Sequence, residues 1–342
     1  MALRPRPTRL GHYDVVAKIG GGGMATIYLG RATDHVAALK VLRHEDAQAV
    51  DMFLDESKLL SLLSHENITR TYEYGEDNGE HFIAMELLLG RTLVDVWEAC
   101  VARKLALRLD LSAWICARVA DGLAHAHALV DERGAPLFVI HRDVNPSNVF
   151  LTFDGRVKLF DFGLAKSLGR RAESSAGIVK GKLPYLSPEQ IMQLDVDHRA
   201  DVFMLGTTLY ELTTMRRLFK RDDDVDTVKA VRNGAIPDPR AFVAGYPDAL
   251  WSIASRALQR NRDNRYADAG AFARDLDAFV RSIAPADPST LVGPILDELF
   301  PGERAKQMGW LRSASASTRG AAGPTLPPPA PLPSVDPKER KS

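Results

Sequence analysis

The order of strand-like and helical segments is the feature that most constrains how this chain can fold. Short β-branched and aliphatic runs separated by turns fill most of the chain before Leu93, and helical spacing dominates after it. Strands first and helices second is typical of an α+β protein whose strands and helices are segregated. The expected strands are 13–19, 27–32, 36–42, 69–75 and 81–87, with shorter ones at 139–140, 149–152 and 157–160, and the main expected helices are 47–64, 109–130 and 200–212.

Composition excludes several classes of protein. The 342 residues carry 44 basic and 44 acidic side chains, so the net charge is zero, which argues against a nucleic-acid-binding protein. Two cysteines are too few for a disulfide framework. No apolar run reaches the length of a membrane helix, and the N-terminus lacks the apolar region of a secretory signal. We therefore expect a cytoplasmic protein without a membrane span.

A run of glycines lies between two expected strands, at 20–23. Glycines let backbone N–H groups approach a phosphate closely, although a flexible hairpin tip would need no more than this. The lysine of a Walker loop is absent. Lys40 lies in the following apolar strand, and Glu56 lies sixteen positions later in an expected helix. A buried Lys and a buried Glu are each costly unless they are paired, so we expect these two to meet.

Three further motifs follow in a fixed order. Residues 141–148 read His-Arg-Asp-Val-Asn-Pro-Ser-Asn, 161–163 read Asp-Phe-Gly, and 187–189 read Ser-Pro-Glu. Together with the glycine run and Lys40, they match the protein-kinase signature set in order. The sequence resembles a Hanks-type (eukaryotic-like) bacterial serine/threonine protein kinase over about residues 12–282.

The resemblance implies a bilobal α+β fold and several site roles. Asp143 would accept the proton of the substrate hydroxyl, and Lys40, held by Glu56, would contact the α- and β-phosphates of ATP. Asn148 and Asp161 would hold Mg²⁺, with Mn²⁺ as an alternative. The glycine loop would cover the phosphates, Met85 would be the gatekeeper, Glu86 and Leu88 would offer backbone groups to adenine, and apolar side chains would sandwich its ring. The nucleotide-binding residues implied are Ile19, Gly20, Gly21, Gly22, Gly23, Met24, Ala25, Thr26, Ile27, Ala38, Lys40, Met85, Glu86, Leu88, Phe150 and Asp161.

Other matches imply packing roles. Glu189 and Arg265 resemble the buried ion pair behind the activation segment, and Asp201 resembles the helix carboxylate that accepts hydrogen bonds from the catalytic-loop backbone. Leu60, His141 and Phe162 resemble stacked residues that link the lobes.

The resemblance also implies a division of the chain. Residues 1–11 would be an N-terminal extension and 12–282 the kinase domain, with an N-lobe at about 12–88 and a C-lobe at about 89–282. Residues 283–312 hold one amphipathic stretch that could dock on the body. Residues 313–342 are rich in proline, serine and alanine and cannot bury enough apolar surface to fold, so we expect a disordered tail.

Two positions depart from the family pattern. Asn145 stands where most serine/threonine kinases carry a lysine that touches the γ-phosphate, and Lys182 stands where most carry a threonine beside the catalytic aspartate. We expect Lys182, acting as a catalytic residue, to supply the charge that Asn145 lacks. The alternative is that Lys182 points to solvent and the enzyme is slow or inactive.

The expected activity is transfer of the ATP γ-phosphate to Ser or Thr hydroxyls of protein substrates, including the chain itself. Ser174 and Ser175 are candidate autophosphorylation sites, and Arg142 is the candidate partner of a phosphorylated activation loop. A nucleotide-binding pseudokinase or scaffold with weak activity is the main alternative, and Asn145 is its best support. Tyrosine specificity is disfavoured, because the catalytic loop lacks the Ala-Arg pattern typical of tyrosine kinases, although Lys182 leaves it open.

Overall fold

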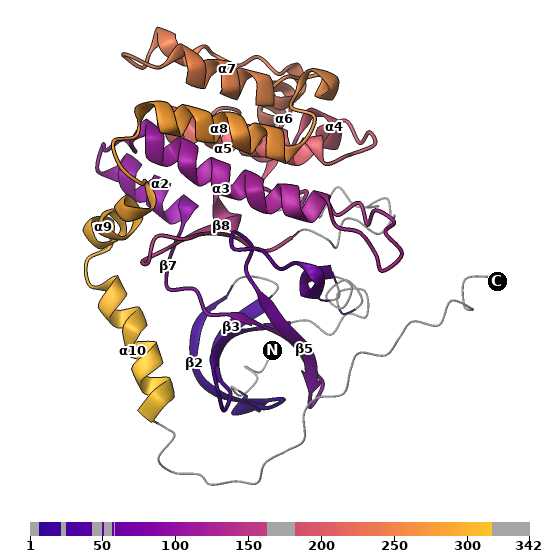
Figure 1. The fold of residues 1–342 in the computed structure, drawn as a ribbon, viewed down its shortest axis with the longest axis vertical. Coiled ribbons are helices and arrows are strands. Elements are labelled where there is room, and N and C mark those ends of the chain that lie inside the picture. The colour runs from indigo at the N-terminus through magenta and orange to yellow at the C-terminus, as the bar shows by residue number, and fades with distance from the viewer. Residues whose placement is uncertain are drawn as a thin grey trace, which may run out of the picture.

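The computed structural model describes residues 7–21, 25–42, 50, 57, 59–162 and 182–316. A curled β-sheet forms one end of the molecule and a cluster of helices forms the other (Figure 1). This arrangement confirms the bilobal α+β fold. In the described part of the chain, no helix is long and apolar enough to cross a membrane.

The N-lobe sheet is antiparallel, in the order β1-β2-β3-β4-β6-β5. Its apolar side chains, among them Tyr13, Leu39 and Phe82, form a small core of their own. The five strands expected in this region are confirmed to within a few residues, and β1 adds residues 9–10 to the sheet from the range assigned to the N-terminal extension. The strands are β1 (Arg9–Leu10), β2 (Tyr13–Gly21), β3 (Ala25–Arg31), β4 (Val36–Leu42), β5 (Thr71–Asp77) and β6 (Glu80–Glu86).

The C-lobe is built around helices α3 and α5. Helix α3 packs against α5 and α8, and nearly every residue of α5 is buried. The threonines of α5 tolerate burial because their hydroxyls donate to the helix backbone, as Thr207 does to the carbonyl of Phe203. The helices are α2 (Leu93–Ala102), α3 (Leu109–His127), α4 (Pro188–Ile191), α5 (Arg199–Thr214), α6 (Asp224–Asn233), α7 (Asp248–Ala257), α8 (Ala269–Ile283), α9 (Ser289–Leu299) and α10 (Glu303–Ala316).

A three-stranded sheet lies between the lobes, with β7 (Gly90–Thr92), β8 (Val149–Thr152) and β9 (Val157–Leu159) in that order. The strand expected at 139–140 is wrong. Those two residues are buried but belong to no strand. Phe138, just before them, has a φ of 49°, which interrupts an extended backbone. The helix expected at 47–64 lies mostly outside the described residues.

The amphipathic stretch after 283 forms a docked helix, α9, and α10 follows it. Helix α10 extends to Ala316, so residues 313–316 of the range assigned to the tail are helical. The rest of that range lies outside the described residues. Both cysteines are buried and free.

Candidate active site

The glycine run connects β2 and β3, which are neighbours in the sheet. Gly20 is paired with Ile27 and Gly21 with Thr26, so the two strands meet at the glycines. Gly22, Gly23 and Met24 lie outside the described residues. Gly21 has a φ of 147°, a backbone conformation that favours glycine. The last two described positions of β2 before the turn, Gly20 and Gly21, therefore carry no side chain.

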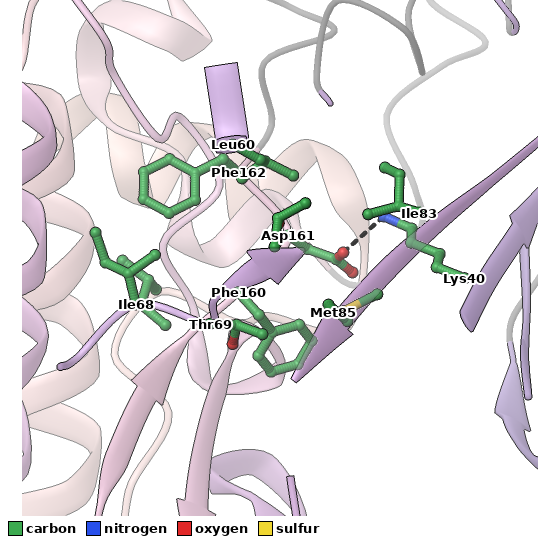
Figure 2. A pocket seen from close by; sticks show the side chains of 11 residues that line it. Lys40, Leu60, Ile68, Thr69, Ile83, Met85, Phe160, Asp161 and Phe162 are labelled. Carbon is green, nitrogen blue, oxygen red and sulfur yellow. Dashed lines mark hydrogen bonds and ion pairs between the residues drawn. The ribbon is translucent and has the colours of Figure 1, made fainter. Parts of the chain in front are cut away.

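Lys40 comes from β4, where it is paired with Ile27 on one side and Ile83 on the other. Its Nζ lies 2.7 Å from Oδ1 of Asp161, which belongs to the Asp-Phe-Gly motif (Figure 2). Glu56, the expected partner of Lys40, lies outside the described residues, and that pairing stays a prediction. The structure thus joins Lys40 to the Asp-Phe-Gly motif, 121 positions along the chain.

Asp161 itself has an unusual backbone. Its φ is 53°, in the left-handed region that non-glycine residues rarely occupy. Burial raises the pKa of Asp161, but the charge and hydrogen bond of Lys40, with the charge of Lys182, outweigh it and hold the pKa below its ordinary value. The carboxylate is therefore ionised and bound by Nζ of Lys40.

Asp143 lies in the loop 141–148 and is held by two amide side chains. Asn148 donates from Nδ2 to the backbone oxygen of Asp143 at 2.8 Å and to Oδ2 at 3.1 Å. Asn145 donates from Nδ2 to the same backbone oxygen at 2.8 Å and to Oδ1 at 3.3 Å. The Oδ1 atom of Asn145 also accepts from the backbone N–H of Ser147. These contacts fix the carboxylate of Asp143 and commit Asn145 to the loop.

Lys182 forms an ion pair with Asp143, between Nζ and Oδ2. The aspartate side chain is 9% exposed and the lysine side chain 36% exposed. The lysine therefore reaches from the surface to the carboxylate. The structure places this cation next to Asn145, where the sequence lacks one.

A second network of hydrogen bonds holds the loop 141–148 to helix α5. Asp201, on α5, accepts the backbone N–H groups of His141 and Arg142 at 2.8 Å and contacts Nε2 of His127 at 2.8 Å. Burial raises the pKa of Asp201, but the hydrogen bonds and charges of His127 and His141 lower it below its ordinary value. The predicted role of Asp201 is confirmed, and the contribution of His127 had no signal in the sequence.

The buried pair Arg265–Glu189 is also confirmed. The two guanidinium nitrogens of Arg265 meet the two carboxylate oxygens of Glu189 at 2.7 and 2.8 Å. Such a bidentate pair fixes orientation as well as distance. It ties α4, at the end of the Ser-Pro-Glu motif, to the segment before α8.

The residues implied for adenine lie near the junction of the lobes. Ala38 on β4 is paired with Met85 on β6. Phe150 lies on β8 and its ring meets that of Phe160 edge to face at 6.3 Å. Leu88 lies in the linker that follows β6. The structure brings these positions to one region from three separate segments.

The side chain of Glu86 is engaged by a lysine and by the backbone of the segment that precedes β5. Its Oε1 lies 2.6 Å from Nζ of Lys158 and accepts the backbone N–H of Arg70 at 2.8 Å. Lys158 is 5% exposed, and its only sequence signal is a lysine within an apolar strand. Lys158 therefore fixes the start of the linker from the C-lobe side, a role that sequence reasoning missed.

A pocket opens behind the Lys40–Asp161 pair (Figure 2). Met85 and Ile83 from β6 and Leu60 and Phe162 line it, together with other apolar side chains. The ring of Phe162 lies 4.5 Å from that of His141, which confirms this part of the expected stack. The candidate phosphorylation sites Ser174 and Ser175 lie outside the described residues.

The comparisons with known proteins agree with this geometry. The family described as protein kinase domain matches residues 13–276. The tyrosine-protein kinase MasK of Myxococcus xanthus is 34% identical over 323 residues, covering 91% of this chain and 50% of that protein. The serine/threonine-protein kinase PknL of Mycobacterium tuberculosis is 32% identical over 277 residues, covering 80% and 66%. PrkC of Bacillus subtilis, also a serine/threonine-protein kinase, is 28% identical and is covered over 41% of its length. The chain thus spans between 41% and 66% of the length of these relatives.

Proposed function

The chain belongs to the protein kinase family, and on that premise we propose that it is a serine/threonine protein kinase that acts on protein substrates, including itself. The observation that carries the proposal is the carboxylate of Asp143, held by Asn148 and paired with Lys182. A carboxylate fixed in this way, beside a cleft that also holds Lys40 and Asp161, is suited to phosphoryl transfer, where positioning and charge do most of the work.

In the proposed reaction, the oxygen of a substrate hydroxyl forms a bond to the γ-phosphorus of ATP. The bond from that phosphorus to the β-phosphate oxygen breaks, ADP leaves, and Asp143 takes the hydroxyl proton. Lys40 would hold the α- and β-phosphates under the glycine hairpin. Met85, Glu86 and Leu88 would position adenine at the linker.

The residues proposed for Mg²⁺ fit a hard cation. The Nδ2 atom of Asn148 is used by Asp143, which leaves its amide oxygen as the ligand atom, and Asp161 is ionised with Oδ2 remaining beside the Oδ1 that Lys40 contacts. An amide oxygen and a carboxylate are ligands that Mg²⁺ accepts, and Mn²⁺ is the alternative. When bound, the cation would neutralise phosphate charge.

Lys182 is proposed as the catalytic cation of this site. A lysine Nζ on Asp143 would lie close to a γ-phosphate presented to that aspartate. Asn145 carries no charge, and its amide is committed to the loop. The position of Lys182 supports the proposal that it provides the charge, and it weakens the alternative in which the lysine points to solvent.

Phosphorylation with labelled MgATP tests the function. The full chain is incubated with MgATP and with a general protein substrate, and the labelled amino acids are identified after hydrolysis. We expect phosphoserine and phosphothreonine from the wild type and none from Asp143→Asn. Label in neither protein, with ATP still bound, would favour the pseudokinase. Phosphotyrosine alone would overturn the proposed residue class and agree with the name of MasK.

Mapping the phosphorylated residues in the same sample tests regulation. We expect phosphate on Ser174 or Ser175. A fully phosphorylating sample with no phosphate between residues 164 and 182 would refute autophosphorylation of this segment.

A further inference from the structure

Helices α9 and α10 run along one side of the molecule, from the helical lobe to the curled sheet (Figure 1). We call residues 289–316 the C-terminal strap. They lie beyond residue 276, where the match to the kinase family ends. The strap contacts three parts of the body: the C-lobe, strand β7 directly after the linker, and the N-lobe.

The strap is anchored on the C-lobe through α9. Arg103, at the end of α2, donates to the backbone oxygens of Glu298 and Leu299 at 2.9 and 2.7 Å and so satisfies the last carbonyls of α9. Gly293 allows close packing, because a Cβ there would lie 2.6 Å from the backbone oxygen of Phe153. Helix α9 therefore packs directly against the backbone after β8, and no side chain larger than glycine fits at position 293.

The middle of the strap holds the start of β7, directly after the linker. Gln307, on α10, is 4% exposed and forms two hydrogen bonds to the backbone of Gly90: it accepts the N–H at 2.8 Å and donates to the oxygen at 3.0 Å. On the other side of Gly90, an added Cβ would lie 2.0 Å from the backbone oxygen of Leu151. Gly90 is thus enclosed between β8 and the strap, four residues after the end of β6.

The far end of the strap reaches the N-lobe. Arg31, at the end of β3, donates from Nη1 to the backbone oxygen of Ala314 at 3.0 Å, and its Nη2 lies 2.6 Å from Asp14 on β2. Ala314 is 1% exposed, although it lies in the last turns of a helix on the outside of the protein. The helix therefore packs on the sheet, and the sheet caps one of its final carbonyls.

We propose that the C-terminal strap sets the separation of the two lobes, and that Gln307 is a positioning residue for nucleotide binding through Gly90. A nucleotide held between a sheet and a helical lobe needs both at one spacing. The strap contacts each of them and also the start of β7, where the linker ends, whereas the linker alone would act as a hinge. The role in nucleotide binding rests on the proposed function, but the effect on lobe separation does not.

The test combines a distance and a kinetic measurement on the full chain. Spin labels are placed at Lys18→Cys in the N-lobe and Ser252→Cys in the C-lobe. Both sites are exposed, and the two native cysteines are buried. We expect a narrow distance distribution that broadens in Gln307→Met, which keeps the side-chain size but removes both hydrogen bonds to Gly90, together with one to Glu303 on the same helix. Because the strap is coupled to the site and not part of it, KM for ATP should rise about tenfold with kcat changed by less than about twofold.

Two further variants make the result decisive. Ala314→Glu disturbs the N-lobe end without touching the linker and should broaden the same distribution. Lys306→Met, exposed on the same helix, should leave both measurements unchanged. Unchanged distances in both Gln307→Met and Ala314→Glu would overturn the proposal. Altered distances in a protein that never transfers phosphate would support the strap and refute the proposed function.

Discussion

Lys182 and Asp143 form an ion pair across 39 positions of the sequence, and this pair places a cation directly on the carboxylate that is proposed to activate the substrate. The lysine reaches the site from the segment before α4, whereas the usual catalytic-loop position holds a neutral asparagine. This position supports the proposal that Lys182 supplies the charge that the neutral asparagine lacks.

Replacing this lysine tests that relocation. We expect Lys182→Ala to lower kcat by about 10²-fold, with KM for ATP little changed, because a charge on the transferring phosphoryl group acts mainly in the transition state. Steady-state kinetics with a protein substrate measure both constants. Lys182→Ala combined with Asn145→Lys should recover part of the loss, since it returns the cation to the loop. Wild-type kcat in Lys182→Ala would contradict the role.

The ion pair of Arg265 with Glu189 should be important for stability. Arg265→Ala leaves a buried carboxylate without its bidentate partner and is expected to lower the free energy of unfolding by about 3–5 kcal/mol. Arg265→Met with Glu189→Gln removes both charges and should cost clearly less. Chemical denaturation of the three proteins measures these differences. Equal losses in the single and double variants would show that packing, rather than the unpaired charge, determines the effect.

Asp201 predicts a pH dependence of stability. Its pKa in the folded protein lies below the ordinary value of 3.8, so its contribution is fully present above pH 3.8 and is lost as the pH falls through the lower, folded value. We expect Asp201→Asn to lower the free energy of unfolding by about 3 kcal/mol at neutral pH, because the hydrogen bonds of His127, His141 and Arg142 lose a charged acceptor.

Urea denaturation of wild type and Asp201→Asn between pH 7 and pH 3 measures the difference. The gap between them should stay constant down to about pH 4 and narrow below it. A gap that widens under acid conditions would have the wrong sign for this carboxylate.

Gly90 should tolerate no side chain. In Gly90→Ala the new Cβ would collide with the backbone oxygen of Leu151, a contact of 2.0 Å that no rotamer can relieve. We expect a large drop in the melting temperature and weaker ATP binding. Gly79→Ala is the matched control: it also has a positive φ, of 77°, but nothing lies within 4 Å of its added Cβ, so it should cost only about 1 kcal/mol. Similar melting temperatures for the two variants would argue against the collision.

Elements with strong local patterns could be predicted from the sequence. The strand at 36–42 and the strand at 149–152 occur where alternation and β-branched residues indicated them, and the long helices α3 and α5 lie within a few residues of their expected bounds. The two-residue run at 139–140 was wrong because apolar character alone does not distinguish a strand from any other buried backbone. Strands β1 and β7 were missed, since two or three residues carry no periodicity.

The site residues also divide into those that the sequence indicated and those that it did not. The order of the motifs was enough to name Asp143, Asn148, Asp161 and Lys40 as one set, because each motif has a fixed spacing. The contacts that support the site from other parts of the chain were not visible in the sequence. Lys158 on Glu86, His127 on Asp201 and Gln307 on Gly90 lie 72, 74 and 217 positions away, and a single sequence has no signal for contacts at such separations.

The sequence by itself indicated the fold class through the order of strand-like and helical segments. Its motifs, through their resemblance to those of protein kinases, indicated the family and the candidate site residues. Only the tertiary structure decided that Lys40 meets Asp161, and it confirmed the expected pair of Arg265 with Glu189 and showed Lys182 on Asp143. It also decided that the segment after residue 283 packs on both lobes. Ion pairs and buried hydrogen bonds depend on distances of a few ångströms between remote segments, and those distances exist only after the chain has packed.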